Sequence, residues 1–172
     1  MIAMPEPSTS DSPAESNRRA KERILLVDDE PAIRQMLSRL LTDEGYDVKP
    51  AINGREAVEF ANHTDFDLVL LDLNMPGMDG WDTYEKLTAR RPLLPFIVIT
   101  ARPNQRFTAL AAGIGALMEK PLDMQKLFAT IRDLLNEPED TRIARMAGRP
   151  SEFHYVPPTM QESGDTNPWR NL

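Results

Sequence analysis

The chain has 172 residues, which favours one domain with extensions, and its formal net charge is −7. This acidic balance argues against a nucleic-acid partner, because such proteins usually present a basic surface. The absence of cysteine excludes disulfides and thiolate metal sites. No apolar run approaches the roughly 20 residues that span a bilayer, and residues 1–20 lack the apolar core of a secretory signal. We therefore expect a soluble, cytoplasmic protein with no membrane contact.

Composition divides the chain into three parts. Residues 1–20 are rich in proline, serine and charge, and predict a disordered N-terminal extension. Residues 21–136 contain the apolar patterns of a folded domain. Residues 137–172 are Pro-rich and predict a largely disordered C-terminal tail, although Arg142, Arg145 and Arg149 could share one solvated face of a short helix.

Short apolar runs recur through the middle part and predict buried strands. They are the runs at residues 24–27, 68–71 and 96–99, a weaker one at 116–118, and a shorter candidate at 46–48.

Helical patterns fill the gaps between these runs. Pro31 suits a first helical position, and the helix that follows is expected to stop at Gly45. Asn53 and Asp123 are expected to cap two further helices, the second of which carries the clearest apolar periodicity. Helices over 80–90 and, weakly, 104–112 complete the series. Strands that alternate with helices predict an α/β fold, in which a doubly wound parallel sheet has helices on both faces.

Reactive polar residues follow the predicted strands. Asp28 and Asp29 follow the run at 24–27, and Asp72 follows the run at 68–71. Thr100 follows the run at 96–99, and Lys120 ends the weaker run at 116–118. Ligands bind at the carboxyl ends of strands in such sheets, so these side chains are expected to converge. Three carboxylates suit a hard divalent cation such as Mg²⁺, and a lysine supplies a point charge for a phosphate oxygen. The set fits phosphoryl transfer, with Asp72 as nucleophile.

These residues resemble the receiver domain of two-component response regulators. The resemblance covers about residues 23–135 and rests on four motifs in a fixed order. They are "ILLVDDEP" (24–31), "DLVLLDLNMPGMDG" (67–80), "IVITA" (97–101) and "EKPLD" (119–123). The family fold, which the resemblance implies here, is flavodoxin-like: a five-stranded parallel sheet of order 2-1-3-4-5.

The resemblance also implies a role for each site residue. Asp72 matches the phosphoacceptor, which takes a phosphoryl group from a histidine kinase or histidine phosphotransfer protein to form 4-aspartylphosphate. Asp28, Asp29, Asp72 and the backbone carbonyl of Asn74 match the ligands of Mg²⁺ (or Mn²⁺), with Asp29 expected in direct contact and Asp28 through water. Thr100 matches the switch hydroxyl and Lys120 the phosphate-binding lysine. The turn at Ala101 offers a backbone amide to the phosphate, and Lys120–Pro121 is expected to be cis.

The sequence departs from the family pattern at Leu117, where a tyrosine or phenylalanine is usual. An aromatic switch coupled to Thr100 is therefore missing there, and we predict that Phe107 or aliphatic packing replaces it. The segment from Thr100 to Lys120 is also slightly short, which predicts a short fourth helix. Asn74 and Arg102 occupy positions that tune water access to the acyl phosphate in receivers.

Only about 36 residues follow the last helix, too few for a helix-turn-helix or catalytic output domain. The prediction is a stand-alone receiver that is not an enzyme on separate substrates, although it catalyses its own phosphorylation and dephosphorylation. It would signal by phosphorelay or by contact with an unknown downstream protein. Two alternatives stay open: a pseudo-receiver that binds partners without phosphorylation, and an aspartate-nucleophile phosphatase of the haloacid dehalogenase type. The phosphatase signature wants a second acid where this chain has Asn74.

Overall fold

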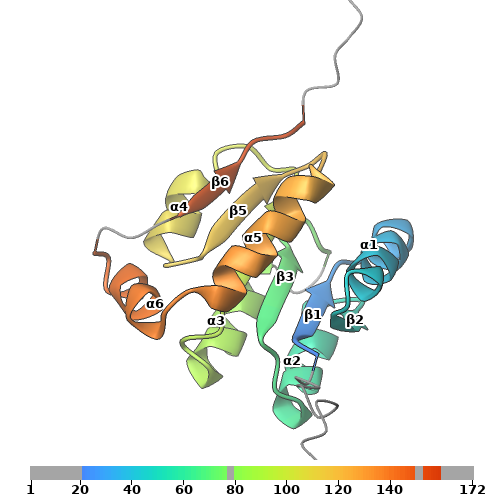
Figure 1. The fold of residues 1–172 in the computed structure, drawn as a ribbon, viewed down its shortest axis with the longest axis horizontal. Helices are drawn as coiled ribbons and strands as arrows, with labels where there is room; N and C mark the ends of the chain where they lie inside the picture. The colour runs from blue at the N-terminus through green and yellow to red at the C-terminus, as the bar shows by residue number, and fades with distance from the viewer. Residues whose placement is uncertain (1–20, 77–79, 150–152, 160–172) are drawn as a thin grey trace, which may run out of the picture.

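A six-stranded parallel sheet lies at the centre of the computed structural model (Figure 1), which describes residues 21–76, 80–149 and 153–159. Its order is β2-β1-β3-β4-β5-β6. The strands are β1 (Arg23–Val27), β2 (Asp47–Ala51), β3 (Leu68–Asp72), β4 (Phe96–Thr100), β5 (Ala116–Glu119) and β6 (His154–Val156). The predicted order 2-1-3-4-5 is confirmed, and β6 extends it by one strand at the β5 edge.

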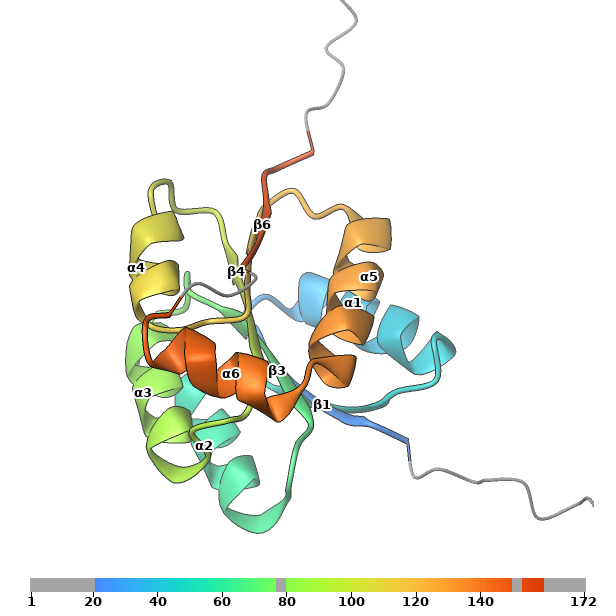
Figure 2. The ribbon, with the colours of Figure 1, turned by 60° about the vertical axis from the view of Figure 1, so that its left-hand side comes forward.

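Helices cover both faces of this sheet (Figure 2). They are α1 (Pro31–Asp43), α2 (Gly54–His63), α3 (Gly80–Arg90), α4 (Arg106–Ala111), α5 (Met124–Asn136) and α6 (Glu139–Met146). Helices α1 and α5 pack on one face, and α2, α3 and α4 on the other. No helix within the described ranges is both long enough and apolar enough to cross a bilayer.

The apolar runs are continuous because each inner strand is buried on both faces. Along β1, Ile24 and Leu26 pack under α1 and α5, while Leu25 and Val27 pack under α2 and α3. All four side chains are at most 1% exposed. Side chains alternate between the faces of a strand, so a run without polar residues fills two cores at once.

The helix boundaries follow the local signals in the sequence. Pro31 is the first residue of α1, where its missing N–H costs no hydrogen bond. The side chain of Asn53 accepts from the Glu56 amide at 2.9 Å, and that of Asp123 accepts from the Lys126 amide at 3.1 Å. Both predicted caps are therefore confirmed. Helix α4 has six residues, as its short connecting segment predicts.

The expectation of a largely disordered tail is wrong for part of residues 137–172. Helix α6 and strand β6 are both formed there, whereas residues 1–20 and 160–172 lie outside the described residues. Arg145, expected on a solvated face, is only 5% exposed. Its guanidinium makes two hydrogen bonds to the Glu137 carboxylate, of 2.5 and 2.7 Å, and a third to the Gly113 carbonyl at 3.2 Å. A charged side chain thus fastens α6, which a search for apolar periodicity does not detect.

Candidate phosphorylation site

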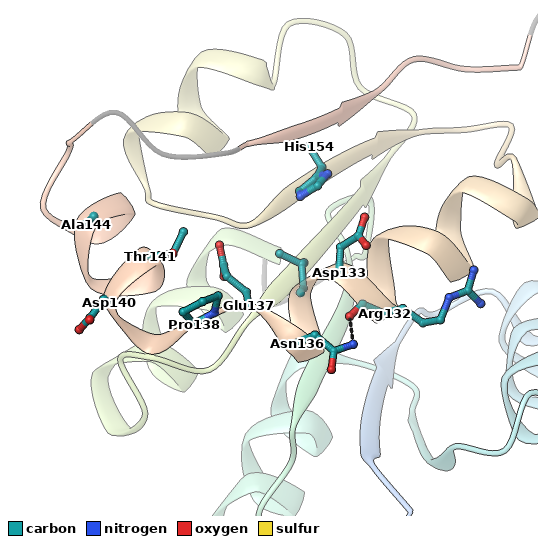
Figure 3. Close-up of a pocket in the computed structure, with 10 residues that line it drawn as sticks. Arg132, Asp133, Asn136, Glu137, Pro138, Asp140, Thr141, Ala144 and His154 are labelled. Carbon is teal, nitrogen blue, oxygen red and sulfur yellow. Dashed lines mark hydrogen bonds between the residues drawn. The ribbon is translucent and has the colours of Figure 1, made fainter.

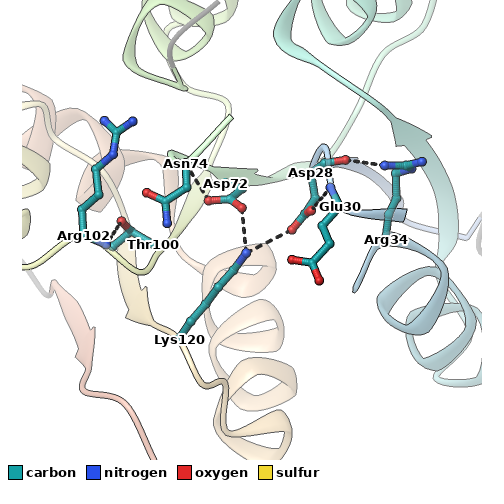
Figure 4. Close-up of polar contacts among 8 residues, drawn as sticks. All are labelled: Asp28, Glu30, Arg34, Asp72, Asn74, Thr100, Arg102 and Lys120. Carbon is teal, nitrogen blue, oxygen red and sulfur yellow. Dashed lines mark hydrogen bonds and ion pairs between the residues drawn. The ribbon is translucent and has the colours of Figure 1, made fainter. Parts of the chain in front are cut away.

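Three carboxylates lie together at the carboxyl edge of the sheet, and Figure 4 shows two of them, Asp28 and Asp72. Strands β1 and β3 are neighbours, so the residues that follow or end them meet: Asp28 and Asp29 after β1, and Asp72 at the end of β3. One oxygen from each carboxylate can be chosen so that all three lie within 4.8 Å of one another. Asp28 and Asp72 are buried and Asp29 is half-buried. The predicted convergence of these three residues is confirmed.

Lys120 brings the opposing charge from the end of β5. Its Nζ lies 2.7 Å from Asp72 Oδ2 and 3.4 Å from Asp28 Oδ2. Burial lowers the pKa of Lys120, but the hydrogen bonds and negative charges of Asp72 and Asp28 outweigh this effect and raise the pKa above its usual value. Lys120 therefore stays charged and links the two strands across the sheet edge. The Lys120–Pro121 bond is cis, as expected.

Asp28 bears the electrostatic cost of this arrangement. Burial raises its pKa, and the nearby Asp72 charge adds to that, although the Glu30 amide and Lys120 oppose the rise. Asp28 Oδ1 accepts from the Glu30 amide at 2.8 Å, and its main-chain carbonyl accepts from the Arg34 guanidinium at 2.7 Å. One lysine against three acids leaves an excess of negative charge, which a divalent cation would neutralise.

The polar atoms of Asn74 indicate whether the site suits a hard cation. Its backbone amide donates to Asp72 Oδ1 at 2.8 Å, which fixes that carboxylate. Its side-chain Oδ1 is buried and has no hydrogen-bond partner among the described residues. A buried oxygen without a donor is costly unless a ligand or water satisfies it. The donor set here consists of oxygens alone, as Mg²⁺ prefers, so the residues fit the ion.

Thr100 completes the edge from β4. Its side chain is fully buried, and its Oγ1 accepts from the Arg102 amide at 2.9 Å. Its carbonyl accepts from the Lys120 amide at 2.8 Å, which joins the ends of β4 and β5. Ala101 and Arg102 lie exposed in the loop that follows, beside Thr100 (Figure 4 shows Arg102).

Two residues that support the site were not identified from the sequence. Arg34 binds the Asp28 carbonyl, and a basic residue in the first turn of a helix, six positions after that aspartate, carries no recognisable signal. Gly80 begins α3 against the end of β3, the strand that carries Asp72. A Cβ at Gly80 would lie 2.8 Å from the Asp72 carbonyl oxygen and 2.7 Å from Leu73 Cα. This close approach requires glycine. In the sequence, the only signal for it is the glycine that ends the motif at residues 67–80.

Leu117 is fully buried in the cluster beneath α2, α3 and α4. Phe107 is 82% exposed, so it does not pack in place of the missing aromatic side chain. The residue beside Leu117 on β6 is instead Tyr155, whose ring packs against the same cluster.

The sheet order and the helices on both faces are those of a flavodoxin-like α/β domain, and this one has an acidic cluster and a lysine at its carboxyl edge. The sequence profile of the response regulator receiver domain matches residues 24–132. The chain therefore belongs to the family of response regulator receiver domains.

Similar sequences and structures agree with this assignment. The transcriptional regulatory protein TcrA of Mycobacterium tuberculosis is 38% identical over 114 residues, which cover 65% of this chain and 45% of TcrA. The response regulator MprA of Mycobacterium leprae is 38% identical over 122 residues, which cover 69% of this chain and 54% of MprA. The chain thus spans about half the length of these curated relatives.

Solved receiver structures share the fold. A CheY-like receiver domain from Methanospirillum hungatei aligns with a TM-score of 0.66 and 31% identity, covering 70% of this chain and 98% of that one. The response regulator TrrA of Thermotoga maritima, solved in complex with Mg²⁺-BeF, aligns with a TM-score of 0.61 and 32% identity, covering 66% and 98%.

Proposed function

We propose that Asp72 accepts a phosphoryl group from a phosphohistidine of a histidine kinase or histidine phosphotransfer protein. One observation carries this proposal: a buried aspartate at the end of the central strand lies 2.7 Å from a lysine ammonium and beside two further acids. Phosphoryl transfer depends mainly on positioning and charge neutralisation, and this geometry supplies both.

In the transfer step a carboxylate oxygen of Asp72 attacks phosphorus in line. The P–O bond to Asp72 forms as the P–N bond to the donor imidazole breaks, and that nitrogen takes up a proton. Lys120 binds a phosphoryl oxygen, and the Thr100 hydroxyl and the Ala101 amide donate to others. Water later attacks phosphorus, which releases phosphate and restores the carboxylate. The domain thereby catalyses its own phosphorylation and dephosphorylation.

Asp28, Asp29, Asp72 and the Asn74 carbonyl would hold Mg²⁺, or Mn²⁺ in its place. Bound there, the ion would neutralise charge that develops on the phosphoryl oxygens. The Mg²⁺-BeF complex of the Thermotoga maritima neighbour supports this assignment. Asn74 and Arg102 would tune how water reaches the acyl phosphate on Asp72.

The proposed output is contact with a downstream protein or onward phosphoryl transfer, as in a stand-alone receiver. Phosphorylation would bias an equilibrium between two conformations of the domain. TcrA is named a transcriptional regulatory protein, but the matched region covers 45% of it. The output proposed here therefore concerns the receiver domain alone, without nucleic-acid contact of its own.

The test is intact-mass measurement after incubation with Mg²⁺ and acetyl phosphate, with Asp72→Asn as the control. A phosphoryl adduct on the parent chain that is absent from Asp72→Asn supports the proposal. No adduct with acetyl phosphate or phosphoramidate would favour a pseudo-receiver. Continuous turnover of a phosphate monoester would favour the haloacid dehalogenase-type phosphatase.

A further inference from the structure

Strand β6, which the five-stranded prediction lacks, replaces β5 as the outer strand of the sheet. Residues 153–159, which we call the C-terminal strap, contain β6 and lie along β5 (Figure 1). The strap begins with the His154 amide bonded to the Gly115 carbonyl at 3.1 Å. It ends with the Thr159 amide and hydroxyl, each bonded to the Pro121 carbonyl at 3.1 Å. It therefore covers β5 from its start to the phosphorylation edge.

The strap is attached on both sides of the phosphate-binding lysine. The Tyr155 hydroxyl donates to Glu119 Oε1 at 3.0 Å, and Thr159 bonds to Pro121. Glu119 and Pro121 are the chain neighbours of Lys120. The backbone that positions Lys120 over Asp72 is thus the same backbone that holds the strap.

Phosphorylation would break the present contact of Lys120. Its Nζ and Asp72 Oδ2 are in direct contact at 2.7 Å, so no phosphoryl group fits between them. A phosphoryl group on Asp72 brings three further oxygens into the same space, and the Lys120 ammonium must shift to bind them. Glu119 and Pro121, the chain neighbours of Lys120, are the residues through which this shift would reach the strap.

The docking of the strap is shallow. Strand β6 has three residues, and of the strap only Val156 is buried. Its His154 lines a hollow of about 810 Å³ between β6, α5 and α6 (Figure 3). On the other face Tyr155 is half-buried against the cluster, and the Arg106 guanidinium at the start of α4 lies 5.0 Å from the centre of its ring. Helix α6, by contrast, is fastened by Arg145.

We propose that the C-terminal strap is a releasable strand that docks on β5 while Asp72 is unphosphorylated and leaves β5 when Asp72 is phosphorylated. This inference rests on the proposed function of Asp72. Helix α6 stays in place as the tether. Release uncovers the backbone edge of β5 that β6 pairs with.

Hydrogen exchange of the full chain, read by mass spectrometry with and without Mg²⁺ and acetyl phosphate, tests the release. We expect faster exchange in residues 153–159 and in β5 on phosphorylation, unchanged exchange in α6, and no response in Asp72→Asn. An intact-mass measurement on the same sample separates two failures. An adduct with unchanged or slower exchange in the strap overturns the strap proposal alone. No adduct overturns the proposed function, and the strap proposal with it.

Linkage supplies a second test with beryllium fluoride, a reversible mimic of the phosphoryl group, because its binding and strap release must favour each other equally. Tyr155→Phe keeps the ring but removes the hydrogen bond to Glu119. At subsaturating beryllium fluoride with Mg²⁺ we expect the ratio of bound to free protein to rise about threefold, the effect of one modest hydrogen bond. Tyr46→Phe, which removes a hydroxyl beside β2 at the opposite sheet edge, is the matched control and should leave the ratio unchanged. A lower or unaltered ratio in Tyr155→Phe overturns the coupling.

Discussion

The buried carboxylate of Asp28 lowers the stability of the fold, although it belongs to the proposed metal site. Its carboxyl group is 1% exposed, and its pKa lies above the usual 3.8, chiefly because of burial. The folded chain therefore binds this proton more tightly than the unfolded chain does. The stabilising contribution is fully present below pH 3.8 and is lost as the pH rises through the folded pKa. At neutral pH and without metal, ionised Asp28 destabilises the fold.

Asp28→Asn should therefore stabilise the metal-free protein at pH 7 by on the order of 1 kcal/mol. The amide keeps an oxygen for the Glu30 N–H while removing the buried charge. Urea denaturation with EDTA at pH 7 and near pH 4 measures this, and the gain should shrink at the lower pH. Asp43→Asn, an exposed acid on α1, is the control and should have little effect. A loss of stability in Asp28→Asn would contradict this account of the site.

Gly80 is the second residue for which the structure makes a sharp prediction. Gly80→Ala places a Cβ within 2.8 Å of backbone atoms of Asp72 and Leu73, which cannot move without displacing β3 or α3. We expect a loss of about 1–3 kcal/mol in the free energy of unfolding, the usual cost of overpacking. Urea denaturation measures the loss. An unchanged midpoint would mean that the start of α3 adjusts freely.

At the scale of elements, α6 is held by charge and not by an apolar face. Glu137 and Arg145 form a buried pair whose side chains are 8% and 4% exposed. Removing one partner of such a pair leaves the other buried and uncompensated. Arg142 adds a longer ion pair to Glu137, at 3.5 Å, and a hydrogen bond to the Leu134 carbonyl at 2.8 Å, so two arginines hold α6 and Arg145 makes the shorter contacts with Glu137.

Arg145→Met should lower the free energy of unfolding by about 2–3 kcal/mol, because Glu137 loses its two short hydrogen bonds and keeps only the longer ion pair with Arg142, at 3.5 Å. The change also removes the hydrogen bond to the Gly113 carbonyl. Thermal or urea unfolding monitors the loss. Arg149→Met, an exposed arginine just beyond α6, is the matched control and should change stability by less than about 1 kcal/mol. Equal effects of the two substitutions would show that the ion pair of Arg145 with Glu137 does not stabilise the fold.

At the scale of the whole molecule, the proposed cation site would link the stability of the fold to the metal concentration. A ligand that binds only the folded chain stabilises it, by about 2.7 kcal/mol at 100 times its Kd. Because the proposed ligands lie on both β1 and β3, Mg²⁺ would join the two central strands of the sheet.

We therefore expect the Tm to rise by several degrees as Mg²⁺ is added. Differential scanning fluorimetry across a magnesium titration measures the shift. The shift should vanish in Asp28→Asn and persist in Arg149→Met. A Tm that is independent of Mg²⁺ in the parent chain would contradict the metal site.

The inner strands of the sheet, and the meeting of three acids at its carboxyl edge, could be predicted from the sequence alone. Residues 24–27, 68–71 and 96–99 are apolar throughout because helices cover both faces, and Asn53 and Asp123 cap their helices through bonds within three residues. These causes are local or periodic, so a single sequence displays them. The polar residues at the strand ends converge for the same reason, since parallel strands share one carboxyl edge.

The formation of α6 and β6, by contrast, depends on tertiary contacts. The three residues of β6 form a strand because β5, some 36 positions earlier, offers an unpaired edge, as the Tyr155–Glu119 contact shows. Arg145 is buried because Glu137 and the Gly113 carbonyl surround it, and its own charge predicts exposure. Pairing between distant segments and satisfaction of a buried charge depend on neighbours in space, which composition and periodicity do not encode.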